Sequence, residues 1–375
     1  MAVGPLGLFA LIALGPLVTA DLRLGPSQFG ALATISFIVA APSAWLLGRW
    51  VDRYSARTII FSLLGTGVLS LVVLSAATSY RWLVAGVLLA GIAMSATNPV
   101  TNRLVSVQVG AGQRGAVMGV KQSGVQIAQL FIGLTLPSVA VLTGWRGALA
   151  TTLTIVALGM VLTHRYVPAG RPPPPADGGD RTEQPLPHQV WLLLAYGFVS
   201  GAALQATIVH LPLFAFQEVS FSVAAAGLIV ALLGGVGLLA RVAWGRVTER
   251  SSDPRQVLVW MALGGATATC LLLAAAQWQA AWLVWSATVL TGATAVAGTV
   301  VVMTAAVRVV PPGSIGTASG LLAVGQYGGF ALGPVSFGLL VEAASYASAW
   351  VVVAVVYAAA AAMVAVARFT TRATR

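Results

Sequence analysis

Polar side chains follow one face of an apolar run in the first half of the chain. The single lysine, Lys121, lies within the run Ala116–Ser138 and is followed by Gln122, Gln126 and Gln129. Because a helix repeats every 3.6 residues, the glutamines at i, i+4 and i+7 share one face. Lys121 could bind an anion in a cavity, or its ammonium could extend to a nearby aqueous interface. The amides are too polar to face hydrocarbon, so they line either a cavity or a helix–helix contact.

Other candidate binding residues also interrupt apolar runs. Asn98 and Asn102 share a helix face at i, i+4, and Arg103 lies where an orienting charge is expected. Gln205 and His210 follow in a later run, where the imidazole could exchange protons near neutral pH or make a plain polar contact. The remaining binding candidates are Gln326 and Tyr327, with Thr294 and Thr299 secondary to them.

Several kinds of chemistry are excluded by what the sequence lacks. There is no Walker A loop and no HExxH motif, and the three histidines and Cys270 are too few to suggest a metal centre. No carboxylate falls deep in an apolar run, since Asp21, Glu218 and Glu342 lie at run ends. The basic residues punctuate apolar runs and form no basic face, which excludes nucleic acid as a partner. We therefore expect neither an enzyme nor a bound cofactor.

These residues must be positioned by helices that cross a membrane. The 375 residues are 58% hydrophobic and only 8% charged, whereas soluble domains are about a quarter charged. Runs of about 20 apolar residues span hydrocarbon as helices, because backbone polar groups must be bonded internally. The predicted spans are Ala2–Ala20, Gln28–Leu47, Thr58–Thr78, Trp82–Leu104, Ala116–Ser138, Gly147–Thr163, Val190–Phe214, Ser222–Val242, Val257–Ala276, Ala281–Val307, Ile315–Val341 and Tyr346–Ala367.

The distribution of arginine predicts the orientation. Sixteen arginines fall on the side that bears both termini, and only Arg23, Arg81 and Arg146 fall on the other. The positive-inside rule then places both termini in the cytoplasm of a multi-pass protein of the cell membrane. Arg241 is interpreted as one of these orienting charges. The first run resembles a signal peptide at Val18-Thr19-Ala20, but it lacks a basic start and is interpreted as a true span.

The two halves of the chain repeat each other. Pro16, Gly30 and Gly48 correspond to Pro212, Gly227 and Gly245, and the pair Asp52-Arg53 corresponds to Glu249-Arg250. A linker rich in proline and charge, residues 168–189, separates residues 1–167 from residues 190–375. We therefore expect an all-α membrane protein of two pseudo-symmetric six-helix bundles. In such repeats the solute site lies between the halves, near the membrane midplane.

One connection carries a recognisable motif. The stretch from Gly48 through Asp52 and Arg53 to Arg57 resembles the loop 2–3 signature of the major facilitator superfamily, with Ser55 replacing a usual glycine. Gly245 to Arg250 resembles its degenerate copy in loop 8–9. The stretch from Met118 to Gly124 is loosely similar to the cyanate and nitrite transporters of that superfamily. The superfamily resemblance covers the whole chain, including Gly144-Trp145-Arg146 before the sixth span.

The resemblance implies roles for residues in these loops. Asp52 would clamp the positive N-terminus of the eleventh span, near Pro312-Gly313-Ser314, with Arg53 and Arg57 pairing across the same seam. Glu249 and Arg250 would act in the same way on the fifth span. The set of gating candidates is Gly48, Asp52, Arg53, Arg57, Gly245, Glu249 and Arg250. The positive-inside rule alone would also explain the arginines.

The resemblance also implies a function. We expect a secondary transporter that moves a small polar or anionic solute by alternating access, with protons or another ion as a possible coupling partner. The alternatives are efflux of lipophilic compounds and, more distantly, a non-transporting membrane sensor on the same fold. The absence of a deep carboxylate disfavours a cationic solute, because a buried carboxylate would supply the attraction.

Overall fold

The computed structural model describes residues 3–51, 54–95, 97, 100–101, 104–105, 109–110, 113–167, 169–170, 186–310 and 314–373. Every regular element among these residues is a helix. The chain divides into two compact units. Unit 1 comprises residues 1–24 and 35–180, and unit 2 comprises residues 25–34 and 181–375.

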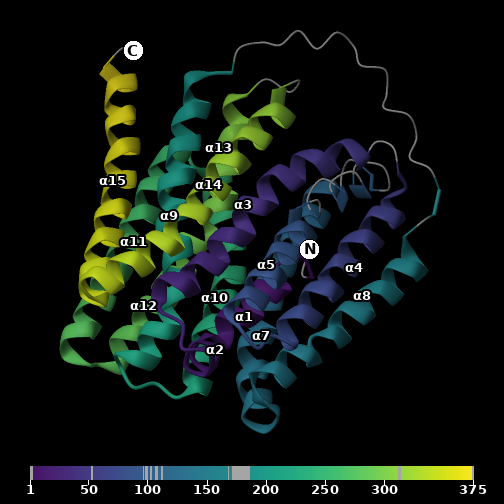
Figure 1. Cartoon of the computed structure of the whole chain (residues 1–375). Helices are drawn as coiled ribbons and strands as arrows, with labels where there is room; N and C mark the ends of the chain where they lie inside the picture. The colour runs from purple at the N-terminus through teal and green to yellow at the C-terminus, as the bar shows by residue number, and fades with distance from the viewer. Residues whose placement is uncertain are drawn as a thin grey trace. The chain divides into compact units, whose positions relative to one another are not determined.

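The helices of the first half are α1 (Leu6–Ala13), α2 (Gly15–Leu22), α3 (Pro26–Val51), α4 (Ala56–Ser75), α5 (Tyr80–Ser95), α7 (Arg114–Thr151) and α8 (Leu153–Tyr166) (Figure 1). The first predicted span, Ala2–Ala20, is wrong as a continuous helix, because it breaks into α1 and α2 at Leu14, whose φ is −96° and ψ is 6°. Pro16, in the first turn of α2, explains the break, since proline has no N–H to continue the bonding of α1.

A single glycine separates the fifth and sixth spans. α7 covers the fifth predicted run, bends at Gly144, where φ is 72° and ψ is 168°, and continues into the start of the sixth run, the rest of which is α8. Glycine adopts positive φ without the steric penalty that a side chain would bring. No atom lies within 4 Å of the position that a Cβ would take at Gly144, so backbone conformation alone requires glycine there.

The helices of the second half are α9 (His188–Gln217), α10 (Val223–Arg250), α11 (Pro254–Trp278), α12 (Ala281–Ala293), α13 (Gly298–Val309), α14 (Ile315–Ala343) and α15 (Tyr346–Ala373). A 3-10 turn, η2 (Ala295–Ala297), joins α12 to α13 within the tenth predicted span. Ser222 caps α10 by accepting a hydrogen bond from the Ala225 N–H, and Asp253 caps α11 with Pro254 in its first turn. Each of the six predicted spans of this half contains helix.

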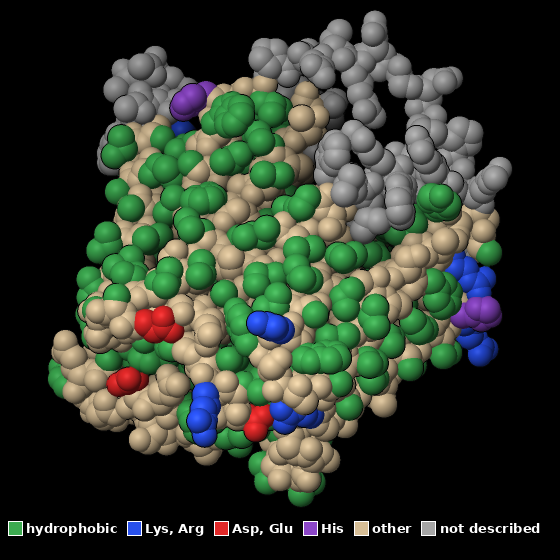
Figure 2. Space-filling view, in the orientation of Figure 1, with side chains coloured by type: hydrophobic (Ala, Val, Ile, Leu, Met, Phe, Trp, Pro, Cys, Tyr) green, Lys and Arg blue, Asp and Glu red, His purple; other side chains and the backbone are tan. Residues whose placement is uncertain are grey.

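The surface matches a hydrocarbon environment. Nine helical stretches of the described residues are long and apolar enough to cross a membrane. Large apolar side chains such as Leu142 and Val355 are exposed on these stretches. Figure 2 shows hydrophobic side chains spread over the described part of the visible face, with few charged ones among them. Such a surface is expected where lipid replaces water as solvent.

α9 and α14 approach each other more closely than side chains would allow. A Cβ at Gly329 would lie 2.1 Å from the Phe198 carbonyl oxygen, and a Cβ at Gly333 would lie 2.0 Å from the Ala202 carbonyl oxygen. Small residues permit such backbone contacts between helices in membranes. The two helices therefore form a tight pair that fixes the positions of the polar side chains on both.

Candidate functional site

Unit 2 contains a pocket lined by polar but uncharged side chains. The pocket is narrow in this conformation, with room for about one water molecule. Its polar lining consists of Ser200 on α9, Thr299 on α13, Gln326 on α14, and the hydroxyls of two tyrosines. None of the described lining residues carries a charge. The remaining walls are apolar or glycine: Gly197, Gly201, Leu204, Met261, Ala295, Gly298 and Val302.

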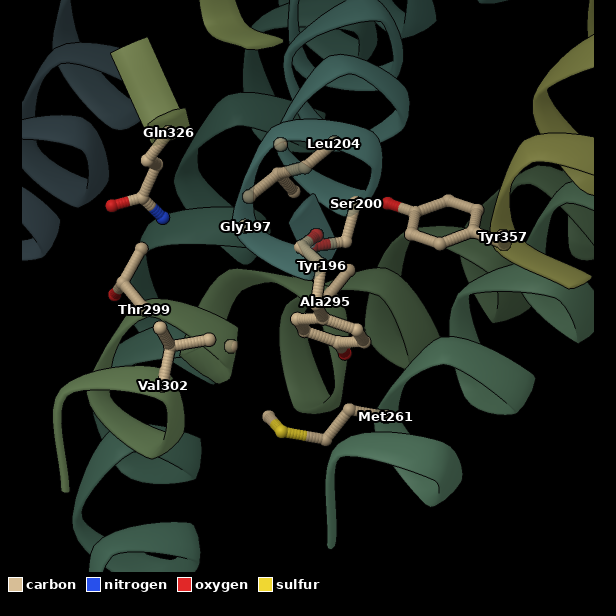
Figure 3. Close-up of a pocket in the computed structure, with 12 residues that line it drawn as sticks. Tyr196, Gly197, Ser200, Leu204, Met261, Ala295, Thr299, Val302, Gln326 and Tyr357 are labelled. Carbon is tan, nitrogen blue, oxygen red and sulfur yellow. The ribbon is translucent and has the colours of Figure 1, made fainter. Parts of the chain in front are cut away.

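The two tyrosines, Tyr196 on α9 and Tyr357 on α15, differ in how their hydroxyls are satisfied. Tyr196 donates a hydrogen bond to the Leu258 carbonyl at 3.0 Å. The Tyr357 hydroxyl is buried and has no hydrogen-bond partner among the described residues. In Figure 3 the Tyr357 ring enters from α15 with its hydroxyl directed toward α9. A buried hydroxyl without a partner is unfavourable, so this group is suited to a hydrogen bond with a molecule in the pocket.

The Tyr357 ring is held in place by a glycine of α11. A Cβ at Gly265 would lie 2.8–2.9 Å from three carbons of the ring, so the ring packs directly on the helix backbone. The pocket face of α9 is similarly bare, since Gly197, Ser200 and Gly201 follow the spacing i, i+3, i+4. Small residues on both helices create the space that the pocket occupies.

The predicted candidates of unit 2 fall in two environments. Gln326 lines the pocket, whereas Tyr327 is absent from its lining and has its ring 6.1 Å from Phe330. Gln205 is buried with its amide nitrogen unpartnered among the described residues. His210 is fully buried; its Nε2 lies 2.9 Å from the Pro334 carbonyl, and its ring stacks on Phe337 at 4.7 Å. His210 therefore joins α9 to α14 by a polar contact.

The amide stripe of α7 in unit 1 is only partly exposed. Lys121 is half-buried and Gln122 is exposed, whereas Gln126 and Gln129 are buried. The large exposed apolar side chains of this helix, including Phe131 and Leu134, lie on a different face. At 100° per residue the stripe lies more than a quarter turn away from that face. The amides thus avoid the surface that is suited to lipid.

Some predicted residues lie outside the described part of the chain. Asp52, Arg53, Asn98, Asn102 and Arg103 belong to this group, and for Gly48 only the helical backbone is described.

Arg57, a predicted gating residue, has its partners within unit 1. Its guanidinium contacts His164 Nδ1, and its Cζ lies 5.9 Å from the centre of the Phe61 ring. These contacts join the start of α4 to the end of α8. The gating roles remain predictions.

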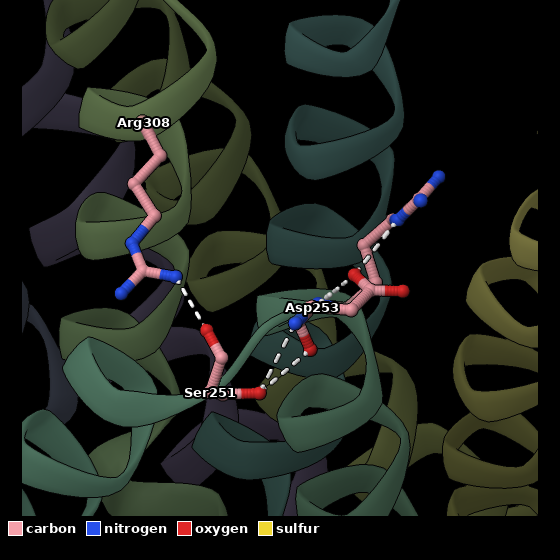
Figure 4. Close-up of polar contacts among 4 residues, drawn as sticks. Ser251, Asp253 and Arg308 are labelled. Atoms are coloured by element: carbon pink, nitrogen blue, oxygen red, sulfur yellow. Dashed lines mark hydrogen bonds and ion pairs between the residues drawn. The ribbon is translucent and has the colours of Figure 1, made fainter.

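The loop after α10 is held by an arginine that the sequence did not single out. Arg308, near the end of α13, donates to the Ser251 carbonyl at 2.8 Å (Figure 4). It also donates to the Glu249 carbonyl. Arginine at a helix C-terminus satisfies carbonyls that have no partner within the helix. The exposed Glu249 takes part through its backbone and not through its carboxylate.

Arg308→Gln is expected to lower the stability of unit 2 by no more than about 1 kcal/mol, because the contact is exposed and screened. The measurement is the thermal unfolding midpoint of the purified protein in detergent. Glu249→Ala is the matched control and should leave the midpoint unchanged, since alanine keeps the carbonyl. A larger loss for Glu249→Ala than for Arg308→Gln would contradict this assignment.

A second cluster of polar contacts in unit 1 is built around Arg146 and Asp21. Arg146 pairs with Asp21 at 2.9 Å and donates from Nε to the Ala77 carbonyl at 2.7 Å. The Trp145 indole N–H donates to the same carboxylate at 3.1 Å. The Gly144-Trp145-Arg146 motif thus connects the ends of three helices, and Asp21 is engaged in this contact.

The helical architecture and the apolar surface define the class of the protein. Each predicted span of the first half also contains described helix. The molecule is a polytopic helical membrane protein.

The chain belongs to the Major Facilitator Superfamily, whose family model matches residues 2–325 and, in a second alignment, residues 193–375. It is 27% identical over 337 residues to an uncharacterized MFS-type transporter of Mycobacterium tuberculosis, covering 86% of this chain and 73% of the relative.

Solved structures share the fold at low sequence identity. A bacterial homologue of the human lysosomal transporter Spinster, in an inward-facing and occupied conformation, superposes with a TM-score of 0.79 at 17% identity, covering 98% of this chain and 94% of that one. The nucleoside transporter NupG gives 0.71 at 17%, covering 97% and 99%. The human organic anion transporter MFSD10 gives 0.69 at 14%, covering 97% of each chain.

Proposed function

We propose that the protein is a secondary active transporter that moves a small polar solute, uncharged or anionic, by alternating access. The observation that carries this proposal is the unit 2 pocket, where Ser200, Thr299, Gln326 and the unpartnered Tyr357 hydroxyl surround space without a charged group. Uncharged donors and acceptors orient a polar molecule without demanding a particular charge.

The distribution of charge supports an anion over a cation. Among the described residues the carboxylates of unit 2 lie at helix ends, as with Glu218 at the end of α9 and Glu342 near the end of α14. Lys121 is by contrast half-buried, near the start of an apolar stretch of α7 and seven residues into the helix. We propose that its ammonium attracts the anionic group of the solute, with Gln122 and Gln126 on the same helix.

The solved relatives suggest probes. One is a nucleoside transporter and another is an organic anion transporter. Uridine serves as an uncharged polar probe and benzoate as a small anion. A lipophilic dye tests the alternative of lipophile efflux, which the apolar walls formed by Leu204, Met261 and Val302 would favour.

Lys121→Gln is expected to reduce the initial rate of benzoate uptake into proteoliposomes by roughly 10–100-fold, because a hydrogen bond to a charged group contributes about 1.5–3 kcal/mol. Arg246→Gln, which removes an exposed positive charge from α10, is the matched control and should retain uptake. The proposal of a polar solute would be contradicted if the protein transported the dye equally well with and without Lys121→Gln. The same result would require that neither benzoate nor uridine is taken up.

We further propose a plasma-membrane location with both termini cytoplasmic, and two bundles, residues 1–167 and 190–375, joined by the linker 168–189. The excess of arginine on one side supports the orientation. Coupling to protons remains part of the proposal, with His210 and Asp21 as the groups to substitute first.

A further inference from the structure

We propose that Arg241 of α10 binds the anionic group of the transported solute, which narrows the proposed function to a carboxylate- or phosphate-bearing molecule. Arg241 lies within the apolar stretch Val223–Arg250, nine residues before its end. The residue is half-buried, and its Nε is enclosed with no acceptor among the described residues. The inference rests on the proposed function for the identity of the anion.

The other arginines with described contacts have partners. Arg146 pairs with Asp21 and Arg255 with Asp253, at 2.9 and 3.0 Å. Arg308 donates to carbonyls at the end of α10, and Arg57 contacts His164. An enclosed guanidinium N–H that lacks an acceptor is unfavourable in a low-dielectric setting. Arg241 is therefore a site where a supplied acceptor would bind favourably.

Orientation alone does not explain this position. Arg246 and Arg250 lie on the same helix, closer to its end, and both are exposed. These two exposed arginines at the helix end already satisfy the positive-inside rule, so the rule does not require a third arginine further into the span. Charged residues enclosed within spans usually serve a ligand or an ion pathway.

The helix surface beside Arg241 is bare of side chains. Gly237 and Gly245 stand four residues before and after it, on the same face. A Cβ at Gly245 would have Val300 Cγ1, at 3.9 Å, as its nearest neighbour, so α10 is loosely packed at that position. The neighbouring Trp244 is fixed by its indole hydrogen bond to the Ala293 carbonyl at 2.6 Å. The guanidinium thus lies in surroundings with little side-chain bulk next to it on its own helix.

The chemistry of the group defines the ligand. A guanidinium presents parallel N–H donors that match the two oxygens of a carboxylate or phosphate, and it stays charged at all physiological pH values. An uncharged solute would leave that charge uncompensated. The expected ligand is a small organic anion that is recognised at its acidic group.

The test measures binding separately from transport. Purified wild-type protein in detergent is titrated with benzoate and with glycerol 3-phosphate, and the rise of the thermal unfolding midpoint reports binding to the folded state. We expect at least one anion to stabilise the wild type saturably. Arg241→Gln should raise its Kd at least about tenfold. Arg246→Gln is the matched control and should bind like the wild type, since Arg246 is exposed on the same helix. Uridine is the uncharged control probe.

Arg241→Lys separates charge from geometry. It keeps the charge but cannot form the two parallel bonds, so an intermediate Kd is expected. If Arg241→Gln does not purify as a folded protein, the Kd of Arg241→Lys is compared with that of the wild type instead. Equal stabilisation of wild type and Arg241 variants by anions, or no stabilisation of the wild type by either anion, would overturn the inference. Anion binding that depends on Arg241 without uptake in proteoliposomes would instead contradict the proposed function alone.

Discussion

Gly329→Val is expected to prevent accumulation of folded protein. The substitution would place a Cβ 2.1 Å from the Phe198 carbonyl oxygen and 2.9 Å from the Ala202 nitrogen, both of which are backbone atoms. Backbone cannot move aside as a flexible side chain can, so α9 and α14 would have to separate. Overpacking of a well-packed contact destabilises by about 1–3 kcal/mol, and a clash with two backbone atoms should reach at least the upper end. The measurement is the monodisperse yield after detergent extraction, with the thermal unfolding midpoint of what remains.

Gly320→Val provides the control for this prediction. Gly320 lies on the same helix, is exposed, and has no atom within 4 Å of its potential Cβ. Valine there should leave the yield and the unfolding midpoint near those of the wild type, because valine has a slightly better helix propensity than glycine. Equal behaviour of the two variants would show that the α9–α14 contact does not support the fold.

Gly197→Leu is expected to abolish solute uptake while leaving the protein folded. Gly197 lines the unit 2 pocket, and no atom lies within 4 Å of the position its Cβ would take. Leucine is also a better helix former than glycine, by about 0.8–1 kcal/mol. The new side chain therefore enters the empty space without a clash at its Cβ. We expect loss of uptake by at least roughly tenfold, measured as initial rates in proteoliposomes at equal protein content.

Gly298→Leu extends this test from a second helix. It lines the same pocket from α13, and its potential Cβ also meets no atom within 4 Å. Gly320→Leu adds the same side chain outside the pocket and should keep wild-type uptake. Full activity of both pocket variants, with unchanged unfolding midpoints, would exclude this pocket as part of the solute pathway.

The helices could be predicted from sequence because membrane spans need long apolar runs, and each of those runs contains described helix. The break at Leu14 was missed, although Pro16 marks it, because a hydropathy window averages across a single proline. The continuation of α7 through Gly144 was anticipated only as a short separation. Its positive φ is a local backbone property that apolarity does not encode.

The site was harder to predict than the fold. Gln326 stood out because an amide within an apolar run is unusual, and it lines the pocket. Tyr196, Ser200 and Tyr357 did not stand out, since hydroxyls occur throughout spans and Ser200 can bond its own helix, as it does at 2.6 Å to the Tyr196 carbonyl. Only packing reveals that the Tyr357 hydroxyl lacks a partner. The small-residue spacing of Gly197, Ser200 and Gly201 was the available signal on α9.

The bend at Gly144 also has a consequence for biosynthesis. Only one residue separates the fifth and sixth spans, so almost no polar loop is available to lie outside the bilayer after the fifth span has inserted. We infer that the two spans enter the membrane together, as a helical hairpin that forms before or during release from the insertion machinery. A reporter inserted at this point would hence disturb assembly and give a misleading map of the topology.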